Sequence, residues 1–257
     1  MSFLDGPTPL AFAHRGGALL AANNGIENTL TAFQNAVDLG YRYLETDVHT
    51  SRDGVVYAFH DVELTRMAGT VSAFRDLDAA SIDAILVGDR EPIPRFADLL
   101  EAFPDARFNI DVKSDDAVDP TLAVLRDADA LDRVCLASFS GERLARLRAT
   151  APAVPTCCSR AEIALLRFGP SRRLQSLGRR RGGACLQVPI RTRQATVVTP
   201  GFVRRAHAVD LQVHVWTIDD PAEMRYLLDI GVDGLMSDRV DVLRDVLVER
   251  GQWRSDS

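Results

Sequence analysis

The sequence predicts an α/β fold of the TIM type, in which eight parallel strands close into a barrel with helices outside it. Short apolar runs alternate with amphipathic helical patterns along the chain, which is typical of a parallel sheet covered by helices. Barrels of this type commonly use about 250 residues as one unit, and this chain has 257. A single domain over residues 1–257 is therefore expected.

Nine strands are expected, at residues 10–14, 43–49, 55–60, 107–113, 134–139, 155–158, 184–189, 212–218 and 234–237. Amphipathic helices are expected between most of them, among them residues 27–39, 95–103, 141–149 and 221–230. The first of these helices precedes Gly40, which suits a helix C-cap. Residues 61–95 are rich in loop formers and are a candidate for a small insertion lobe.

The strand that exceeds the eight of a barrel is expected to be 55–60. The hairpin signal Asp53-Gly54 separates it from strand 43–49, and a parallel connection would need a crossover of about a dozen residues or more. Strand 55–60 should therefore run antiparallel to strand 43–49. With a two-residue turn, His60 would lie opposite Asp47, and side chains that are directly opposed lie close together.

Composition and charge exclude several classes of protein. The net charge of −6 argues against nonspecific nucleic-acid binding. No apolar run approaches the roughly 18 residues that cross a bilayer, and residues 1–7 lack the basic and apolar regions of a secretory signal. None of the four cysteines forms a Cys-x-x-Cys pair, so they are expected to be buried thiols in a reducing cytoplasm: Cys135, Cys157, Cys158 and Cys185.

Acidic residues gather near the ends of two expected strands. Glu45 and Asp47 are two residues apart and so share one face of a strand, and Asp111 lies near the end of strand 107–113. The carboxyl ends of barrel strands meet at one mouth. Three carboxylates at that mouth suit a hard cation, Mg²⁺ or Ca²⁺; the alternative is ordinary salt bridging to Arg15 and Lys113.

Basic groups accompany these acids. His14 and His60 end two of the expected strands, and imidazole can both accept and donate a proton near neutral pH. Arg15 and Lys113 add fixed positive charge, which indicates an anionic substrate such as a phosphate ester. Lys113 is the only lysine beside 29 arginines, which suggests a place where a compact ammonium is needed; the alternative is the chance survival of one surface lysine.

Several motifs together carry a family resemblance. They are His14-Arg15-Gly16-Gly17, Glu27-Asn28-Thr29-Leu30, Leu44-Glu45-Thr46-Asp47, Asp53-Gly54, Phe59-His60-Asp61, Asn109-Ile110-Asp111-Val112-Lys113, Ser138-Phe139, Trp216-Thr217 and Gly231-Val232-Asp233-Gly234-Leu235-Met236-Ser237-Asp238. In this order, over residues 10–240, the chain resembles the glycerophosphodiester phosphodiesterase family. The opening His-Arg-Gly with Glu-x-Asp and His-Asp is the specific part of the pattern.

The resemblance implies a metal-dependent barrel enzyme that cleaves glycerophosphodiesters to glycerol 3-phosphate and an alcohol. It implies that the glycerol 2-hydroxyl is the nucleophile and that water opens a cyclic phosphate. The roles it implies are metal ligation by Glu45, Asp47 and Asp111, acid–base catalysis by His14 and His60, and phosphate binding by Arg15 and Lys113.

Three residues of the pattern remain open. The family commonly has Glu where this chain has Asp111, whose side chain is one methylene shorter, so direct ligation would need a closer strand or a bridging water. Glu27 either orients the site or stabilises the start of a helix through capping and the helix dipole. Trp216 is expected at the mouth, where it would pack on the glycerol or the leaving group; a plain core tryptophan is the alternative.

Two other functions compete with hydrolysis of soluble diesters. Residues 165–181 combine six arginines with apolar side chains, so they form either a solvated basic face or a surface for anionic lipid. Contact with lipid would favour a lysophospholipase D-type activity on lysolipids. A barrel that binds phosphorylated ligands without turnover is the other alternative, and the presence of both histidines argues against it. The sequence predicts neither the oligomeric state nor the leaving alcohol.

Overall fold

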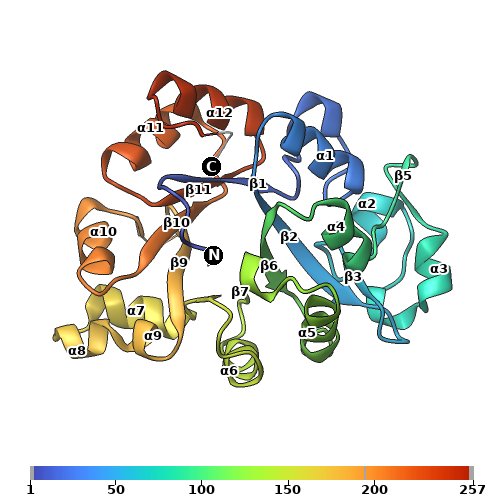
Figure 1. The fold of residues 1–257 in the computed structure, drawn as a ribbon, viewed down its shortest axis with the longest axis horizontal. Coiled ribbons are helices and arrows are strands. Elements are labelled where there is room, and N and C mark those ends of the chain that lie inside the picture. The colour runs from blue at the N-terminus through green and yellow to red at the C-terminus, as the bar shows by residue number, and fades with distance from the viewer. Residues whose placement is uncertain (1–2, 194, 255–257) are drawn as a thin grey trace.

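In the computed structural model, which describes residues 3–193 and 195–254, eight parallel strands form a closed barrel (Figure 1). They are β1 (Leu10–His14), β2 (Tyr43–Thr50), β6 (Arg107–Val112), β7 (Val134–Ala137), β8 (Thr156–Cys157), β9 (Gly183–Pro189), β10 (Gln212–Trp216) and β11 (Gly234–Ser237). Strand β1 pairs with both β2 and β11, which closes the sheet. The predicted TIM-type barrel is confirmed.

Helices surround the barrel and pack their apolar faces against it (Figure 1). The longer ones are α1 (Leu30–Asp38), α4 (Phe96–Ala102), α5 (Val118–Asp127), α6 (Gly141–Thr150), α7 (Arg160–Phe168), α10 (Pro200–His207), α11 (Pro221–Asp229) and α12 (Val240–Glu249). Helix α1 begins three residues later than the predicted start at 27. Asn28 has a left-handed φ of 61°, and the Thr29 hydroxyl caps the helix by accepting from the Ala32 N–H.

Strand β3 (Val56–Ala58) pairs antiparallel with the outer part of β2, as the hairpin signal predicted. The predicted register was wrong by one residue. Val48 lies opposite Ala58, and the Phe59 N–H donates to the Asp47 carbonyl at 2.9 Å, so His60 does not face Asp47. The turn holds three residues, because the Ser51 N–H donates to the Val55 carbonyl and Gly54 takes a left-handed φ of 86°.

Residues 61–95 leave the barrel after β3 and return before α4. They contain α2 (Thr65–Ala68), α3 (Ala79–Asp83) and a two-stranded sheet of β4 (Leu86–Val87) and β5 (Glu91–Pro92). Phe74, Leu64 and Ile82 are almost fully buried in a cluster that is separate from the main core and includes Tyr57 of β3. This segment therefore packs on the outer side of β3.

The arginine-rich segment 165–181 lies on the outside of the barrel, beside β9. It comprises the end of α7, then α8 (Arg172–Gln175) and α9 (Leu177–Arg180) (Figure 1). Phe168 is 74% exposed there. The four cysteines, by contrast, are buried thiols. Within residues 3–193 and 195–254, no helix is long and apolar enough to cross a membrane.

Candidate active site

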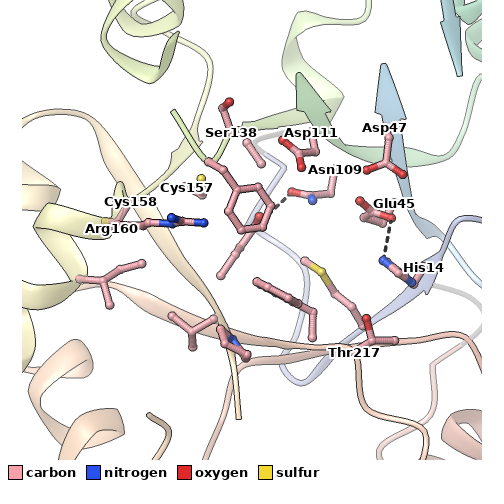
Figure 2. Close-up of a pocket in the computed structure, with 18 of the residues that line it drawn as sticks. His14, Glu45, Asp47, Asn109, Asp111, Ser138, Cys157, Cys158, Arg160 and Thr217 are labelled. Carbon is pink, nitrogen blue, oxygen red and sulfur yellow. Dashed lines mark hydrogen bonds and ion pairs between the residues drawn. The ribbon is translucent and has the colours of Figure 1, made fainter. Parts of the chain in front are cut away.

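A cavity of about 520 Å³ lies in the barrel among the carboxyl ends of the strands. Its wall contains all the side chains that the sequence singled out for the site: His14, Arg15, Glu45, Asp47, His60, Asp111, Lys113 and Trp216. Figure 2 shows His14, Glu45, Asp47 and Asp111 along one side of it. The structure therefore brings together residues that are as much as 202 positions apart, from His14 to Trp216.

The loop after β1 positions the first of these residues. Arg15, Gly16 and Gly17 all have positive φ, at 51°, 81° and 86°. A Cβ on Gly16 would lie 2.9 Å from Ala32, and one on Gly17 would lie 2.6 Å from the Val240 side chain. Only glycine allows this loop to pack so closely on α1 and α12. The tight loop holds Arg15 against β2, where its N–H donates to the Glu45 carbonyl at 3.0 Å.

Three carboxylates and one ammonium form the centre of the cavity. The Lys113 Nζ lies 2.7 Å from Asp47 Oδ1 and 2.7 Å from Asp111 Oδ2, and the Arg15 Nε lies 3.4 Å from Asp47 Oδ2. Burial opposes ionisation of Asp47, but Lys113 and Arg15 outweigh it and hold its pKa below the ordinary value. Burial, followed by the like charge of Asp47, raises the pKa of Glu45 to about 7.

The acidic groups suit a hard divalent cation. Asp111 Oδ1 is buried and has no hydrogen-bond partner in the described part of the chain, and burial raises the pKa of this carboxyl group. A cation that accepted oxygen ligands would relieve both this unpaired oxygen and the repulsion between Glu45 and Asp47. Among residues 3–193 and 195–254, however, no three acidic, His or Cys side chains already form a metal centre. The Lys113 ammonium instead lies between Asp47 and Asp111.

Both histidines are held in the same way by a carboxylate. His14 Nδ1 is 2.7 Å from Asp238 Oδ1, and its Nε2 is 3.7 Å from Glu45 Oε2. His60 Nδ1 is 2.6 Å from Asp61 Oδ1. A carboxylate can only accept, so in each ring Nδ1 carries the proton that is shared with it and Nε2 is left for the cavity.

The acidic neighbours of His14 make its imidazole a stronger proton acceptor. Burial works against protonation, but Glu45 and Asp238 outweigh it and raise the pKa of His14 above its ordinary value. Asp238 is itself fixed, because its N–H donates to Asp219 Oδ1 at 2.9 Å. The structure thus places the carboxylate of Asp238, the last residue of the C-terminal motif, on His14.

Two aromatic rings, those of Phe139 and Trp216, form an aromatic wall in the cavity. Phe139 and Trp216 meet edge to face with ring centroids 5.7 Å apart, and both line the cavity. Trp216 also packs on the smaller core cluster inside the barrel. It is thus part of the cavity wall as well as of the core.

Comparison with known proteins assigns the family. The model of the Glycerophosphoryl diester phosphodiesterase family matches residues 14–242. The chain belongs to this family. A Mycobacterium tuberculosis protein named "Probable glycerophosphodiester phosphodiesterase 2" is 40% identical over 97% of this chain and 98% of its own length. This chain is therefore a glycerophosphodiester phosphodiesterase, as the sequence motifs predicted.

Two more distant matches differ in what their names describe. A human protein named lysophospholipase D is 25% identical over 91% of this chain and 85% of its own length. The structure of an Oleispira antarctica phosphodiesterase, in complex with the product sn-glycerol-3-phosphate, superposes with a TM-score of 0.79 at 21% identity, over 94% of this chain and 97% of that one. This likeness shows that the phosphodiesterase shares its fold.

Two side chains of the phosphodiesterase site were missed by the sequence analysis. Asn28 is buried and donates through Nδ2 to Asp47 Oδ2 at 3.2 Å, while its Oδ1 accepts from the Thr46 hydroxyl at 2.8 Å. Asn tolerates a left-handed φ better than most residues, so Asn28 between Glu27 and the helix cap was the available signal. Nothing in the sequence pointed to Arg66 of α2, because its partner Glu27 lies 39 residues earlier in the chain.

Arg66 connects the 61–95 segment of the phosphodiesterase to the site. Its Nη2 donates to Glu27 Oε1 at 2.6 Å and its Nε donates to Asp61 Oδ2 at 2.6 Å. Glu27 also accepts from the Arg15 Nη1 at 3.1 Å. Alternating charges therefore run from Arg15 through Glu27, Arg66 and Asp61 to His60. The sequence left two roles open for Glu27; its carboxylate pairs with Arg15 and Arg66, and the cap of α1 is Thr29.

Arg66→Gln is expected to lower kcat of the phosphodiesterase about tenfold, because a loosened Asp61 no longer holds His60 in place. Arg75→Gln is the matched control, since Arg75 lies in the same segment but is 77% exposed and 3.9 Å from Asp76. Steady-state rates on one diester, with melting temperatures of both variants, test this. Equal rates for the two variants would contradict the positioning role of Arg66.

Proposed function

We propose that this enzyme hydrolyses glycerophosphodiesters to glycerol 3-phosphate and an alcohol, with a divalent cation and with His14 and His60 as the acid–base pair. The observation that carries the proposal is the shared geometry of the two imidazoles. Each lines the cavity and each has Nδ1 on a carboxylate, which leaves two Nε2 atoms for proton transfer. The product named for the Oleispira antarctica structure, sn-glycerol-3-phosphate, supports this substrate class.

We assign the two proton transfers of the first step to different histidines. His14 Nε2 takes the proton of the glycerol 2-hydroxyl as that oxygen bonds to phosphorus. The bond from phosphorus to the leaving oxygen breaks, and His60 gives that oxygen its proton. The product is a cyclic phosphate. Water then bonds to phosphorus as His60 takes one of its protons, and the bond to the 2-oxygen breaks as His14 returns its proton to that oxygen; the second water proton stays on the new phosphate hydroxyl.

Mg²⁺ or Ca²⁺ is the cofactor that the acidic cluster suits, with Glu45, Asp47 and Asp111 as its ligands. When bound, such a cation neutralises phosphate charge and orients the glycerol hydroxyls. The shorter Asp111 is compatible with this role because its Oδ1 has no hydrogen-bond partner in the described structure. The donor set does not distinguish Mg²⁺ from Ca²⁺, since both prefer oxygen ligands.

The remaining side chains of the cavity bind the substrate. Arg15 and Lys113 supply fixed positive charge for the phosphate, and Trp216 offers an aromatic face to the glycerol or the leaving group. Small-molecule diesters are the expected substrates, and the net charge of −6 argues against a nucleic-acid partner. Four buried thiols favour a cytoplasmic location.

Hydrolysis of lysolipids at a membrane is the second candidate function. Its support is the segment 165–181, where Phe168 is 74% exposed and Arg173, Arg179 and Arg180 are also exposed, and a human relative is named lysophospholipase D. A basic surface with an exposed aromatic ring suits anionic lipid. A barrel that only binds phosphorylated ligands is disfavoured by the presence of both histidines.

Alcohol release from glycerophosphocholine, glycerophosphoethanolamine and lysophosphatidylcholine tests these proposals. Each substrate is incubated with Mg²⁺, with Ca²⁺ and with EDTA. Cleavage of the short diesters that depends on the cation is expected, and EDTA should abolish it. Faster release from lysophosphatidylcholine would favour the membrane role. Undiminished cleavage in EDTA would refute the need for a cation, and binding without cleavage would leave the phosphate-binding barrel.

A further inference from the structure

The two halves of the cavity carry different charges. Glu45, Asp47 and Asp111 supply the carboxylates that line the described cavity, and all three lie on β2 and β6. Figure 2 shows Arg160 reaching into the pocket from the side opposite Glu45, and its guanidinium contacts Phe139 of the aromatic wall. If the phosphate is bound at the acidic half, as the proposed function requires, the leaving alcohol lies along the aromatic half.

The position of Arg160 is not explained by the helix that carries it. Arg160 is the first residue of α7, where the positive end of the helix dipole repels a cation. The helix start is already satisfied by Ser159 and Glu162, which form a reciprocal capping box. Within the described residues the guanidinium of Arg160 has no hydrogen bond or ion pair; it lies over the Phe139 ring, 5.1 Å from Cζ to the centroid.

The aromatic wall already faces two cations. Besides Arg160, the Lys113 Nζ lies 5.8 Å from the centroid of the Phe139 ring. A quaternary ammonium such as choline binds well where an aromatic face is free and a carboxylate is near. At this wall Phe139 is engaged by protein cations, and the carboxylates nearest to it, those of Asp47 and Asp111, are already paired with the Lys113 ammonium at 2.7 Å. A cationic leaving group would therefore meet repulsion there.

We propose that the aromatic half selects leaving alcohols that carry an anionic group, with Arg160 as the residue that determines this specificity. The guanidinium presents paired N–H donors that match a phosphate or carboxylate, and it can remain stacked on Phe139 while it binds one. The inference rests on the proposed function, because it concerns the alcohol that the same reaction releases. It places glycerophosphodiesters with an acidic head group above those of choline.

Three diesters that differ in the charge of the leaving alcohol test the inference. Glycerophosphoinositol 4-phosphate and glycerophosphoinositol share one ring and differ by a phosphate, and glycerophosphocholine is cationic. The measured quantity is the ratio of kcat/KM for the anionic diester to that for the cationic one. Wild-type enzyme should favour the anionic diester by about tenfold, and Arg160→Glu should lower the ratio by about tenfold or more, since it reverses the charge near the ligand. Arg160→Lys should keep a ratio above one.

The control is Arg173→Glu, which makes the same change of charge on α8, at an exposed residue that does not line the cavity. Its ratio should stay within about twofold of wild type, because a distant exposed charge is screened by salt. If Arg160→Glu leaves the ratio as unchanged as Arg173→Glu does, the inference on Arg160 is overturned and the proposed function still stands. Failure of the wild-type enzyme to cleave any of the three diesters with either cation would overturn the proposed function as well.

Discussion

His14→Ala is expected to lower kcat by about 10²–10⁴-fold, the usual contribution of a positioned general acid or base. The loss follows from the geometry of this side chain. Its Nδ1 is held by Asp238 at 2.7 Å, and its Nε2 lies 3.7 Å from Glu45 at the wall of the cavity. The other described histidine that lines the cavity is His60, which Asp61 holds at 2.6 Å and to which the acid role is assigned. Single-turnover rates at saturating diester and cation measure the step directly.

Two further variants separate the chemistry of His14 from its effect on folding. Asp238→Asn keeps the imidazole but weakens its anchor, so it should lose less activity than His14→Ala, about tenfold. His207→Ala should have wild-type rates, because His207 is 45% exposed and pairs with Asp233 away from the cavity. A fall of less than threefold for His14→Ala would remove this histidine from the mechanism.

Most of the fold could be predicted because the chain repeats one local pattern. Strands β1 and β11 have the predicted bounds, and eight of the nine expected strands are barrel strands while the run at 55–60 is the added strand β3. The register of the β2–β3 hairpin could not be predicted, because one residue more or less in the turn shifts every cross-strand residue pair by one position. The register is set by a three-residue turn, in which the Ser51 N–H donates to the Val55 carbonyl and Gly54 has a left-handed φ.

The candidate site was predicted where the residues stand at strand ends, and it was missed where the contacts cross between segments. Glu45 and Asp47 share a strand face, so their convergence follows from β geometry alone. Asn28 and Arg66 join the site through a loop and an outer helix, whose placement depends on packing of residues 61–95. Sequence spacing contains no information on such packing.

The charge of Lys113 accounts for much of the stability of the acidic cluster. Burial disfavours the ammonium, but Asp47 and Asp111 outweigh it and raise the pKa of Lys113 above its ordinary value, so the side chain stays charged. Only 16% of the side chain is exposed. Removing one partner of such a buried cluster leaves the opposite charges without compensation, which costs about 3–5 kcal/mol.

Lys113→Met is therefore expected to lower the free energy of unfolding by about 3–5 kcal/mol in EDTA, and to abolish most activity. Urea denaturation followed by circular dichroism measures the change. Arg225→Met is the control: it breaks an ion pair with Glu249 in which the side chains are 44% and 59% exposed, so it should lose about 1 kcal/mol or less. A loss for Lys113→Met no larger than that of the control would contradict the structural role of Lys113.

A divalent cation should restore part of what Lys113→Met loses, and this response tests the acidic cluster as a cation site. Without the ammonium, the carboxylates of Asp47 and Asp111 repel each other, and a cation that binds only the folded state stabilises it by mass action. Mg²⁺ or Ca²⁺ should therefore raise the free energy of unfolding more in Lys113→Met than in the wild type.

Lys113→Arg should keep the stability better but remain impaired in kcat, because a planar guanidinium does not fit where Nζ lies 2.7 Å from each carboxylate. Wild-type turnover in Lys113→Arg would show that any cation suffices at this position, and the single lysine of the chain would then have no special role in the reaction.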